Sequence, residues 1–489
     1  MITWLGTADR MSPWQQCRVV VAGLGAAGFA AADAMLESGA SVRVVDSSTG
    51  DAVTDRANLL ERLGATVELG AAPSLGAADL VIASPGWHPD APLFLAAEAA
   101  GVPIWGDVEM AWHLMHPDRV VPWLGVTGTN GKTTTTTMLD AILRADGHNS
   151  AAVGNIGRPI IEALNDPAGY DVLAVELSSF ELHWAHSLAL HSAAVLNVHE
   201  DHLEWYAYAD DPMAAYTADK ARIFERVTNS CVYNVAEPAT RKMVEDAEVT
   251  EGARAIGFTL GIPAISMVGV VDGAIVDRAF IDRRADSALP LAEVTDVTPN
   301  APHVLADAVA AAALARSFGV KATSVAAGLR SLGQSAHRIE TVAVVDGVTW
   351  VDDSKATNPH AADASLKAFD KVIWVAGGQT KGVHFDDLVA AHKDRLQGAV
   401  LLGVDRADIA AALRRQAPGV PVVELDGTTR AVMADAVAAA RRLAEPGATV
   451  LLAPAAASRD IWTGYDQRGD DFADAVRGAA SDAPDGGGR

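Results

Sequence analysis

The stretch from residue 125 to 137 reads Gly-Val-Thr-Gly-Thr-Asn-Gly-Lys-Thr-Thr-Thr-Thr-Thr and carries groups that bind phosphate. A glycine-rich turn lets backbone N–H groups approach an anion, and the N-terminus of a following helix adds positive potential. Lys132 adds a charge, and Thr133 offers a hydroxyl group to Mg²⁺. The strict eight-residue phosphate-loop pattern would have glycine where the chain has Val126. An ordinary tight turn is the alternative, but the order of strand, loop, lysine and helix favours a nucleotide triphosphate site.

Polar residues follow the next two predicted strands of this region. Glu176 ends an apolar strand over 171–176, which is where a carboxylate that holds Mg²⁺ or water is expected. His202, beside Asp201, follows the next strand and is a candidate metal ligand, although a single histidine is more often structural. Lys220 is the only lysine between positions 132 and 242, and its simplest interpretation is a solvated surface lysine.

A second glycine loop lies near the start of the chain. The strand 18–22 leads into Gly23-Leu-Gly-Ala-Ala-Gly28, an alanine-rich helix, and a strand over 41–45 that ends at Asp46. This order is typical of a Rossmann-type unit that binds a nucleotide diphosphate, with Asp46 accepting a hydrogen bond from a ribose hydroxyl group. NAD and FAD are the usual ligands, and the residues leave that choice open. Ser84-Pro85-Gly86 follows a further strand and is either part of this ligand edge or a plain turn.

Polar or glycine-rich segments also follow the predicted strands in the last third of the chain. Residues 352–359, 377–381 and 454–460 each come after an apolar strand, which predicts another mostly parallel α/β sheet. We expect residues 1–16 to form a loose leader and the small polar residues from Gly478 to be disordered.

Length and charge limit the class of protein. At about 150 residues per domain, a chain of 489 residues predicts three domains, which we place at 1–106, 107–337 and 338–489. The net charge of −24 argues against binding to nucleic acid or to an anionic membrane surface. We expect a cytoplasmic protein, because the two cysteines are distant and neither a signal peptide nor an apolar run of about 20 residues is found. We also expect a monomer.

These motifs together resemble the Mur ligases, the ATP-dependent amide ligases of peptidoglycan precursor synthesis. The resemblance covers nearly the whole chain and rests on Gly128–Thr133, Glu176-Leu-Ser-Ser, Asn197–His202, His337-Arg338, Asp352–Asn358 and Gly377–Lys381. The run Glu-Leu-Ser-Ser-Phe-Glu-Leu from Glu176 and the first glycine loop favour the branch that adds D-glutamate over the branches that add L-alanine or diaminopimelate. No Asp-Asn-Pro-Arg sequence, as the diaminopimelate-adding branch carries, is present.

The resemblance implies an α/β fold of three domains. These would be a Rossmann-like N-terminal domain for a UDP-sugar, a central P-loop-like ATPase domain and a Rossmann-like C-terminal domain for the amino acid. The implied reaction joins UDP-N-acetylmuramoyl-L-alanine to D-glutamate: a carboxylate attacks the γ-phosphate of ATP, and the amine of D-glutamate then attacks the acyl phosphate. Because both substrates are anionic, cations carry much of the catalysis.

The resemblance also assigns residues. The ATP site would comprise Gly128, Thr129, Asn130, Gly131, Lys132, Thr133, Thr134, Asp307, Arg338 and Asp353. One or two Mg²⁺ ions would be held by Thr133, Glu176, His202 and Lys220, the last as an N-carboxylated (carbamylated) lysine. The substrates would contact Gly25, Ala26, Asp46, Ser47, Ser84, Gly86, Asn155, Ser178, Lys355, Thr357, Lys381, Ser458 and Tyr465. Catalysis would rest on Lys132, Glu176, His202, Lys220, Arg338 and Lys355.

The sequence departs from the family pattern in three places. Asp307 stands where an asparagine is usual, and Arg459 stands where an apolar residue is expected. The interval from His202 to Lys220 is longer than the pattern implies, around residues 206–212.

Three alternatives remain at this stage. Another amide ligase of the superfamily, such as a folylpolyglutamate synthetase, would share the ATP loop but would normally lack the UDP-binding domain. An NAD-dependent oxidoreductase fused to an ATPase rests on the first glycine loop and Asp46 alone. A non-catalytic nucleotide-binding regulator would function without Lys132.

Overall fold

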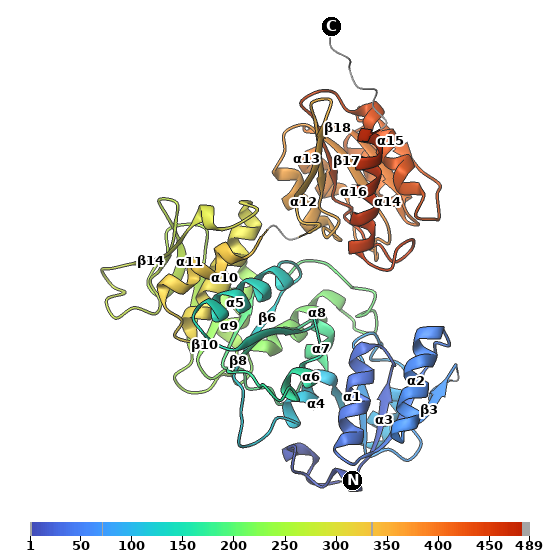
Figure 1. Ribbon diagram of the computed structural model, residues 1–489, viewed down its shortest axis with the longest axis vertical. Coiled ribbons are helices and arrows are strands. Elements are labelled where there is room, and N and C mark those ends of the chain that lie inside the picture. The colour runs from blue at the N-terminus through green and yellow to red at the C-terminus, as the bar shows by residue number, and fades with distance from the viewer. Residues whose placement is uncertain (1, 71, 334–335, 482–489) are drawn as a thin grey trace. The chain divides into compact units, whose positions relative to one another are not determined.

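The computed structural model describes residues 2–70, 72–333 and 336–481, and the chain divides into two compact units. Unit 1 comprises residues 1–198, 205–297 and 304–331, and it contains two β-sheets. Unit 2 comprises residues 199–204, 298–303 and 332–489, and it contains a third sheet. Figure 1 colours both units by residue number, from blue at the N-terminus to red toward the C-terminus.

The first sheet of unit 1 is parallel and has the strand order β3-β2-β1-β4-β5. Its strands are mostly apolar, the central β1 and β4 most of all, as is typical of a parallel sheet covered on both faces. Their bounds are β1 Arg18–Ala22, β2 Ser41–Asp46, β3 Thr66–Leu69, β4 Leu80–Ala83 and β5 Ile104–Gly106. The helices are α1 Ala26–Glu37, α2 Asp51–Leu63, α3 Pro92–Ala100 and α4 Asp107–His113. The order reverses between β1 and β4, so a ligand crevice is expected where the loops after these two strands diverge.

The predicted loose leader is wrong for the described part of residues 1–16. Two short 3₁₀ turns, η1 (Leu5–Thr7) and η2 (Trp14–Gln16), form there. Trp14 is fully buried and meets the ring of Trp4 edge-on at 5.0 Å between centroids. Burial of the Trp14 indole and of part of the Trp4 indole stabilises a segment that has no regular periodicity, which explains why the sequence pattern missed it.

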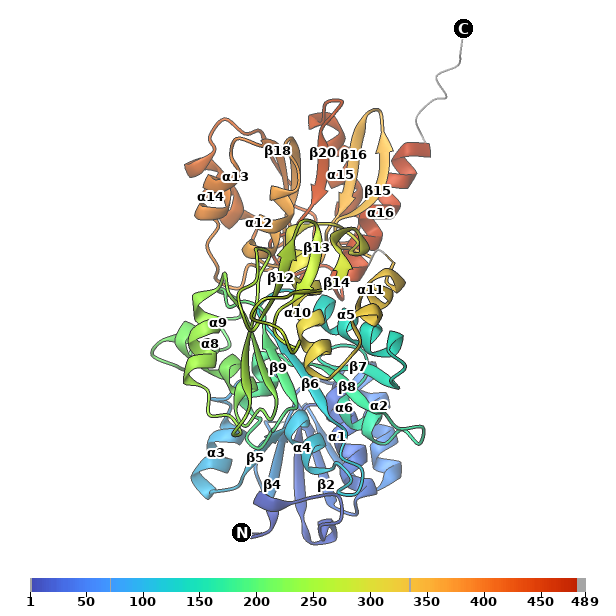
Figure 2. The ribbon, with the colours of Figure 1, turned by 90° about the vertical axis from the view of Figure 1, so that its left-hand side faces the viewer.

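The second sheet of unit 1 has the order β14-β13-β12-β11-β10-β9-β6-β8-β7. The strands are β6 Trp123–Thr127, β7 Ser150–Gly154, β8 Val172–Glu176, β9 Ser192–Val195, β10 Ser230–Asn234, β11 Arg254–Phe258, β12 Met267–Val271, β13 Ala274–Asp277 and β14 Leu289–Glu293. The strands from β7 to β12 in this order pair in parallel. Strands β12, β13 and β14 form an antiparallel extension (Figure 2). Strands β6, β8 and β9 were predicted from the sequence, but this extension was not.

Helices flank the second sheet. They are α5 Lys132–Ala145, α6 Ile160–Leu164, α7 Ser179–His183, α8 Pro212–Ala221, α9 Pro238–Asp246, α10 Pro302–Ser317 and α11 Ala322–Ser331, with 3₁₀ turns η3 Arg222–Phe224 and η4 Val294–Asp296. Helix α11 packs on α5, close enough that a methyl group at Gly328 would lie 2.5 Å from the Ile142 Cα atom. Figure 1 shows the two helices side by side.

The sheet of unit 2 has the order β15-β16-β20-β17-β18-β19. Its strands are β15 Glu340–Val345, β16 Val348–Asp352, β17 Val372–Gly377, β18 Leu396–Leu402, β19 Val422–Glu424 and β20 Thr449–Leu452. Only the β15–β16 pair is antiparallel, so the prediction of a mostly parallel sheet is confirmed. The helices are α12 Pro359–Lys367, α13 Asp386–His392, α14 Arg406–Gln416, α15 Val432–Leu443 and α16 Tyr465–Ser481.

The disorder that we expected from Gly478 onward is wrong for residues 478–481. Helix α16 continues through Gly478 to Ser481, and residues 482–489 lie outside the described part of the chain. No helix among the described residues has the length and apolar character needed to cross a bilayer. Cys17 and Cys231 are buried thiols, and burial raises the pKa of each to about 12.

Candidate functional site

The phosphate loop joins β6 to α5. Gly128 and Gly131 adopt positive φ angles of 158° and 85°, a backbone conformation that glycine adopts without a Cβ penalty. Gly131 is the N-cap of α5, and no side chain caps the helix there. A methyl group at Gly131 would lie 2.2 Å from Asp307 Oδ1, so this carboxylate borders the loop. The uncapped N–H groups and the tight glycines form a cradle for phosphate oxygens.

Lys132 bends back over this loop. Its Nζ donates to the carbonyl oxygens of Gly128 at 2.8 Å and Thr129 at 3.0 Å. Asn130 is fixed by Asn197, which accepts from the Asn130 N–H at 2.8 Å and donates to its carbonyl oxygen at 3.1 Å. The lysine charge is therefore held at the loop.

Lys220 is buried at the same loop and is not a surface residue. Its Nζ is 3.0 Å from the Gly128 carbonyl oxygen and 4.5 Å from the centroid of the Tyr216 ring, and the residue is 1% exposed. The Tyr216 hydroxyl group in turn lies 2.9 Å from Thr129 Oγ1. The solvated interpretation of Lys220 is wrong because helix α8 turns this side chain inward.

Glu176 lies beside the phosphate loop because β8 pairs with β6 in a register that puts Glu176 opposite Val126. Its Oε1 accepts from Asn155 Nδ2 at 2.9 Å. Its Oε2 is buried and has no hydrogen-bond partner among the described residues. A buried carboxylate oxygen without a donor is costly unless it is protonated or meets a cation. The donor set of Glu176 and the Thr133 hydroxyl group, in the first turn of α5, therefore suits Mg²⁺.

Acidic groups continue behind Glu176. Ser178 caps α7 by accepting from the Glu181 N–H at 3.2 Å, and Glu181 accepts from the Ser178 N–H at 2.6 Å. Burial and the nearby Asp107 carboxylate raise the pKa of Glu181 to about 8. Thr134 Oγ1, one residue beyond Thr133, is buried without a hydrogen-bond partner among the described residues.

The predicted residues of the first glycine loop are also gathered at one edge of their sheet. Asp46 accepts from the Leu24 N–H at 2.6 Å and from the Ser48 N–H at 2.8 Å. Gly25 is the N-cap of α1, Ala26 is its first residue, and no side chain caps this helix. Ser84 Oγ lies 3.4 Å from the Gly23 carbonyl oxygen, while Ser47 and Gly86 are exposed in the loops after β2 and β4. These residues form one candidate ligand edge.

His202 belongs to unit 2 rather than to the unit that holds Glu176. Its ring nitrogens lie 3.3 Å from Lys381 Nζ, which is also 3.5 Å from Asp201 Oδ1. Asn358 Nδ2 donates to the other oxygen of Asp201 at 3.3 Å. The metal set of Thr133, Glu176, His202 and Lys220 therefore remains a prediction.

The other unit 2 residues follow strand ends as predicted. Lys355 Nζ is 3.1 Å from the Tyr465 hydroxyl group and 4.8 Å from its ring centroid. Asp353 is buried after β16, and burial raises the pKa of its carboxyl group to about 6, although Ser365 donates to it. Thr357 and Arg338 lie in the loops beside Asp353, and Ser458 is buried after β20.

Sequence reasoning missed Arg468. This fully buried arginine of α16 donates to Ser354 Oγ at 2.9 Å, to the Ser354 carbonyl oxygen at 2.8 Å and to the Ala456 carbonyl oxygen at 3.1 Å. A weaker bond reaches the Gly377 carbonyl oxygen at 3.4 Å. Burial lowers its pKa to about 9. Arg468 thus ties together the loops after β16, β17 and β20, which hold Lys355, Lys381 and Ser458.

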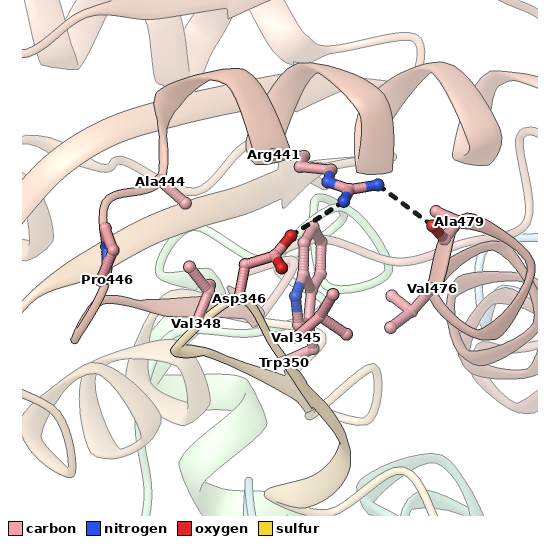
Figure 3. Close-up of a pocket in the computed structure, with 9 residues that line it drawn as sticks. All are labelled: Val345, Asp346, Val348, Trp350, Arg441, Ala444, Pro446, Val476 and Ala479. Atoms are coloured by element: carbon pink, nitrogen blue, oxygen red, sulfur yellow. Dashed lines mark hydrogen bonds and ion pairs between the residues drawn. The ribbon is translucent and has the colours of Figure 1, made fainter. Parts of the chain in front are cut away.

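A pocket of about 180 Å³ lies elsewhere in unit 2 (Figure 3). Arg441 crosses it and pairs with Asp346 at 2.9 Å. The pocket includes Val348, where β16 begins, and Pro446, which precedes β20. The predicted site residues follow the opposite, carboxyl ends of these strands, and none of them lines this pocket.

Three family models match the chain in order. They are the Mur ligase MurD-like N-terminal domain at residues 17–106, the Mur ligase middle domain at 126–267 and the Mur ligase glutamate ligase domain at 337–456. The chain belongs to the Mur ligase family, and its three sheets are those of a three-domain α/β fold.

Relatives within the family are similar over nearly their whole length. The UDP-N-acetylmuramoylalanine–D-glutamate ligase of Streptomyces avermitilis is 56% identical, over 96% of this chain and 99% of the relative. The enzyme of the same name from Thermobifida fusca is 50% identical, over 95% of this chain and 98% of the relative.

Solved structures of Mur-type ligases share the fold at low identity. A pseudomurein peptide ligase type C from Methanothermus fervidus has a TM-score of 0.57 at 17% identity, covering 94% of this chain and 100% of that structure. The MurF ligase of Thermotoga maritima, solved with ADP, has a TM-score of 0.55 at 18% identity, covering 90% of this chain and 96% of that structure. Escherichia coli FolC, also with ADP, covers only 73% of this chain.

Proposed function

We propose that this chain joins D-glutamate to UDP-N-acetylmuramoyl-L-alanine with hydrolysis of ATP to ADP and phosphate. The names of the relatives at 50–56% identity support this reaction. The observation that carries it is the phosphate loop, where Lys132 and the buried Lys220 both bond to the Gly128 carbonyl oxygen. The Lys132 ammonium group at this loop suits a reaction that begins with an anion attacking a triphosphate.

The chain's residues have distinct tasks in the first step. The N–H groups at the start of α5 and the Lys132 ammonium group would bind the β- and γ-phosphates and stabilise charge that develops on the γ-phosphate. A carboxylate oxygen of the L-alanine moiety attacks the phosphorus atom, and ADP leaves with the electron pair of the broken P–O bond. Asn155, which donates to Glu176, would orient the substrate at the same edge of the sheet.

The amine of D-glutamate completes the reaction. It attacks the carbonyl carbon of the acyl phosphate, gives a tetrahedral intermediate, and phosphate leaves as the amide forms. We assign the D-glutamate site to Lys381, Ser458 and Tyr465, with Lys355 and Thr357 toward the substrates. Arg459 adds a cation beside Ser458, and we propose that it contributes to carboxylate binding.

Thr133, Glu176, His202 and Lys220 would hold one or two Mg²⁺ ions. Bound Mg²⁺ would neutralise phosphate charge during transfer. The unpartnered Oε2 atom of Glu176 supports a cation at that position. Asp307 at the loop, with Arg338 and Asp353 of unit 2, would complete the nucleotide site, and Gly128–Thr134 would line it.

We further propose that Lys220 is carbamylated in the active protein. The neutral amine would add to the carbon of CO₂ and release a proton, which turns a cation into an anionic oxygen ligand suited to Mg²⁺. Lys220→Ala should lose activity, and short carboxylic acids should restore part of it by supplying the missing oxygen ligand. Absence of any rescue, together with an intact-protein mass lacking the added CO₂, would argue against the modification.

Domain boundaries at 106 and 337, a monomeric state and a cytoplasmic location are also our proposals. The reaction itself is tested by phosphate release from ATP, Mg²⁺ and UDP-N-acetylmuramoyl-L-alanine with D-glutamate, L-alanine or diaminopimelate. Release that depends on D-glutamate alone is expected. Release that depends on L-alanine or diaminopimelate would assign the chain to another Mur ligase reaction.

A further inference from the structure

Two donor side chains that none of the motifs above includes lie at the glycine loop after β1, Arg56 at Leu24 and Trp87 beside Gly23. We propose that Arg56 and Trp87 bind the UDP portion of the sugar nucleotide, Arg56 on the side of Asp46 and Trp87 on the side of Ser84. This inference rests on the proposed function for its ligand. It identifies residues that set affinity for the nucleotide half of the substrate.

The charge balance of the domain singles out Arg56. Residues 17–106 contain no lysine and only the arginines Arg18, Arg43, Arg56 and Arg62. Arg18 pairs with Asp79 at 2.7 Å, and Arg43 is bound by Glu68 at 3.1 Å and by two loop carbonyl oxygens. Arg62 is exposed in the last turn of α2.

Arg56 alone of these arginines bonds to the glycine loop. It donates from Nη1 to the Leu24 carbonyl oxygen at 3.2 Å, while the Leu24 N–H donates to Asp46. A guanidinium group has five N–H donors, so this one bond orients Arg56 and leaves others for a ligand. A diphosphate near the Asp46 carboxylate needs a compensating cation, and Arg56 supplies it.

Trp87 lies beside the same loop, next to Ser84. A methyl group at Gly23 would lie 2.9 Å from both Trp87 Nε1 and Ser84 Oγ, so the indole N–H and the hydroxyl group border one short stretch of backbone. Within the described chain, no acceptor bonds to this indole N–H, whereas the Trp87 carbonyl oxygen accepts from Trp205 Nε1 at 3.2 Å. Its ring also meets Phe94 edge-on at 5.9 Å. The backbone and ring are therefore held while the N–H remains available to a phosphate oxygen.

Calorimetric titration of the full chain with UDP and with UMP tests both residues. Arg56→Gln should weaken the binding of UDP and of UMP roughly tenfold, which is the contribution of one charge-assisted hydrogen bond. Trp87→Phe keeps an aromatic ring and removes the indole N–H, so it should weaken binding of UDP several-fold and binding of UMP less. Arg62→Gln on the same helix and Trp112→Phe are the matched controls and should bind like the unaltered chain.

Unchanged UDP affinity in Arg56→Gln or Trp87→Phe, with thermal unfolding equal to that of the controls, would overturn the assignment of that residue. The same holds if the unaltered chain does not bind UDP. The proposed ligase activity fails separately, through phosphate release that does not depend on D-glutamate. A chain that failed that assay and still lost UDP affinity in Arg56→Gln would retain this inference and lose the proposed reaction.

Discussion

The two glycine loops of unit 1 share a backbone plan but differ in charge. Each follows a buried parallel strand and leads into a helix without a side-chain cap, at Gly25 for α1 and Gly131 for α5. The first loop has the Asp46 carboxylate bonded to its backbone, and Arg56 is the arginine that reaches it. The second has two lysines on one carbonyl oxygen and the buried carboxylate of Glu176 nearby.

The difference separates binding from transfer. Holding a diphosphate requires donors and a modest positive potential, which a helix N-terminus and one arginine provide. Moving a phosphoryl group requires preorganised charge in a buried site, where it stabilises the transition state more than the bound substrate. The buried lysine and the unpartnered Glu176 oxygen are features of the second loop only.

The strongest test of this separation is Lys132→Met. Loss of the ammonium group should reduce phosphate release by roughly 10²- to 10³-fold, the cost of removing one preorganised transition-state contact. Affinity for UDP should not change, because that ligand uses the first loop. Lys242→Met, at an exposed lysine of α9, is the control. A loss of UDP affinity equal to the loss of turnover would show that the two loops do not act separately.

Substitution of alanine for Gly28 or for Gly131 should impair the binding of one nucleotide in each case. At Gly28 the new Cβ atom would lie 2.0 Å from the Gly23 carbonyl oxygen, and at Gly131 it would lie 2.2 Å from Asp307 Oδ1 with φ at 85°. We expect Gly28→Ala to weaken the binding of UDP and Gly131→Ala to weaken the binding of ATP. Each substitution should also lower the free energy of unfolding by about 1–3 kcal/mol.

Gly50→Ala is the matched control for both glycine variants, because its Cβ atom would meet nothing within 4 Å and its φ is −69°. Urea unfolding and nucleotide titration of the three variants give the comparison. If Gly28→Ala binds UDP like Gly50→Ala, the first loop is not the diphosphate site.

The smallest expected effect concerns pH and the acids behind the second loop. Burial raises the pKa of Glu181 from 4.5 to about 8, so the folded chain binds more protons than the unfolded chain between these values. The associated stability is fully present below about pH 4.5 and is lost as pH rises through 8. Glu181→Gln removes this titration. The unfolding temperature of the variant, measured relative to that of the unaltered chain, should therefore be higher at pH 9 than at pH 5. A constant difference across pH would contradict the shift.

Strand-end chemistry was predictable from the sequence. Glu176 ends one apolar run, and Lys132 follows another by a short loop. The two runs form the paired parallel strands β8 and β6, whose ends lie at one edge of the sheet. The inward direction of Lys220 was not predictable from its spacing, because a lysine on a helix is usually solvated and only the packing of Tyr216 beside it shows otherwise.

Residues that act through long-range bonds gave no local signal. Arg468 bonds to Ser354, which is 114 positions away, and a helical arginine among aspartates has the pattern of a surface residue. The available sequence signal was the neighbouring Gly469, a glycine inside a helix. The structure explains it, because a methyl group there would lie 2.1 Å from His337 Nδ1. The antiparallel strands β12–β14 were missed because they are short and do not alternate clearly between apolar and polar residues. Gly269 interrupts β12 and Pro290 interrupts β14.

The central claim is that the substrate carboxylate attacks ATP and forms an acyl phosphate. The most direct test is to follow the transfer of a carboxylate oxygen to phosphate. UDP-N-acetylmuramoyl-L-alanine labelled with ¹⁸O in its free carboxylate is incubated with ATP, Mg²⁺ and D-glutamate, and the released phosphate is analysed by mass. An acyl phosphate at the second loop predicts one ¹⁸O atom in each phosphate released, and release that requires D-glutamate. Phosphate without ¹⁸O would show that the carboxylate never attacked ATP and would contradict the account.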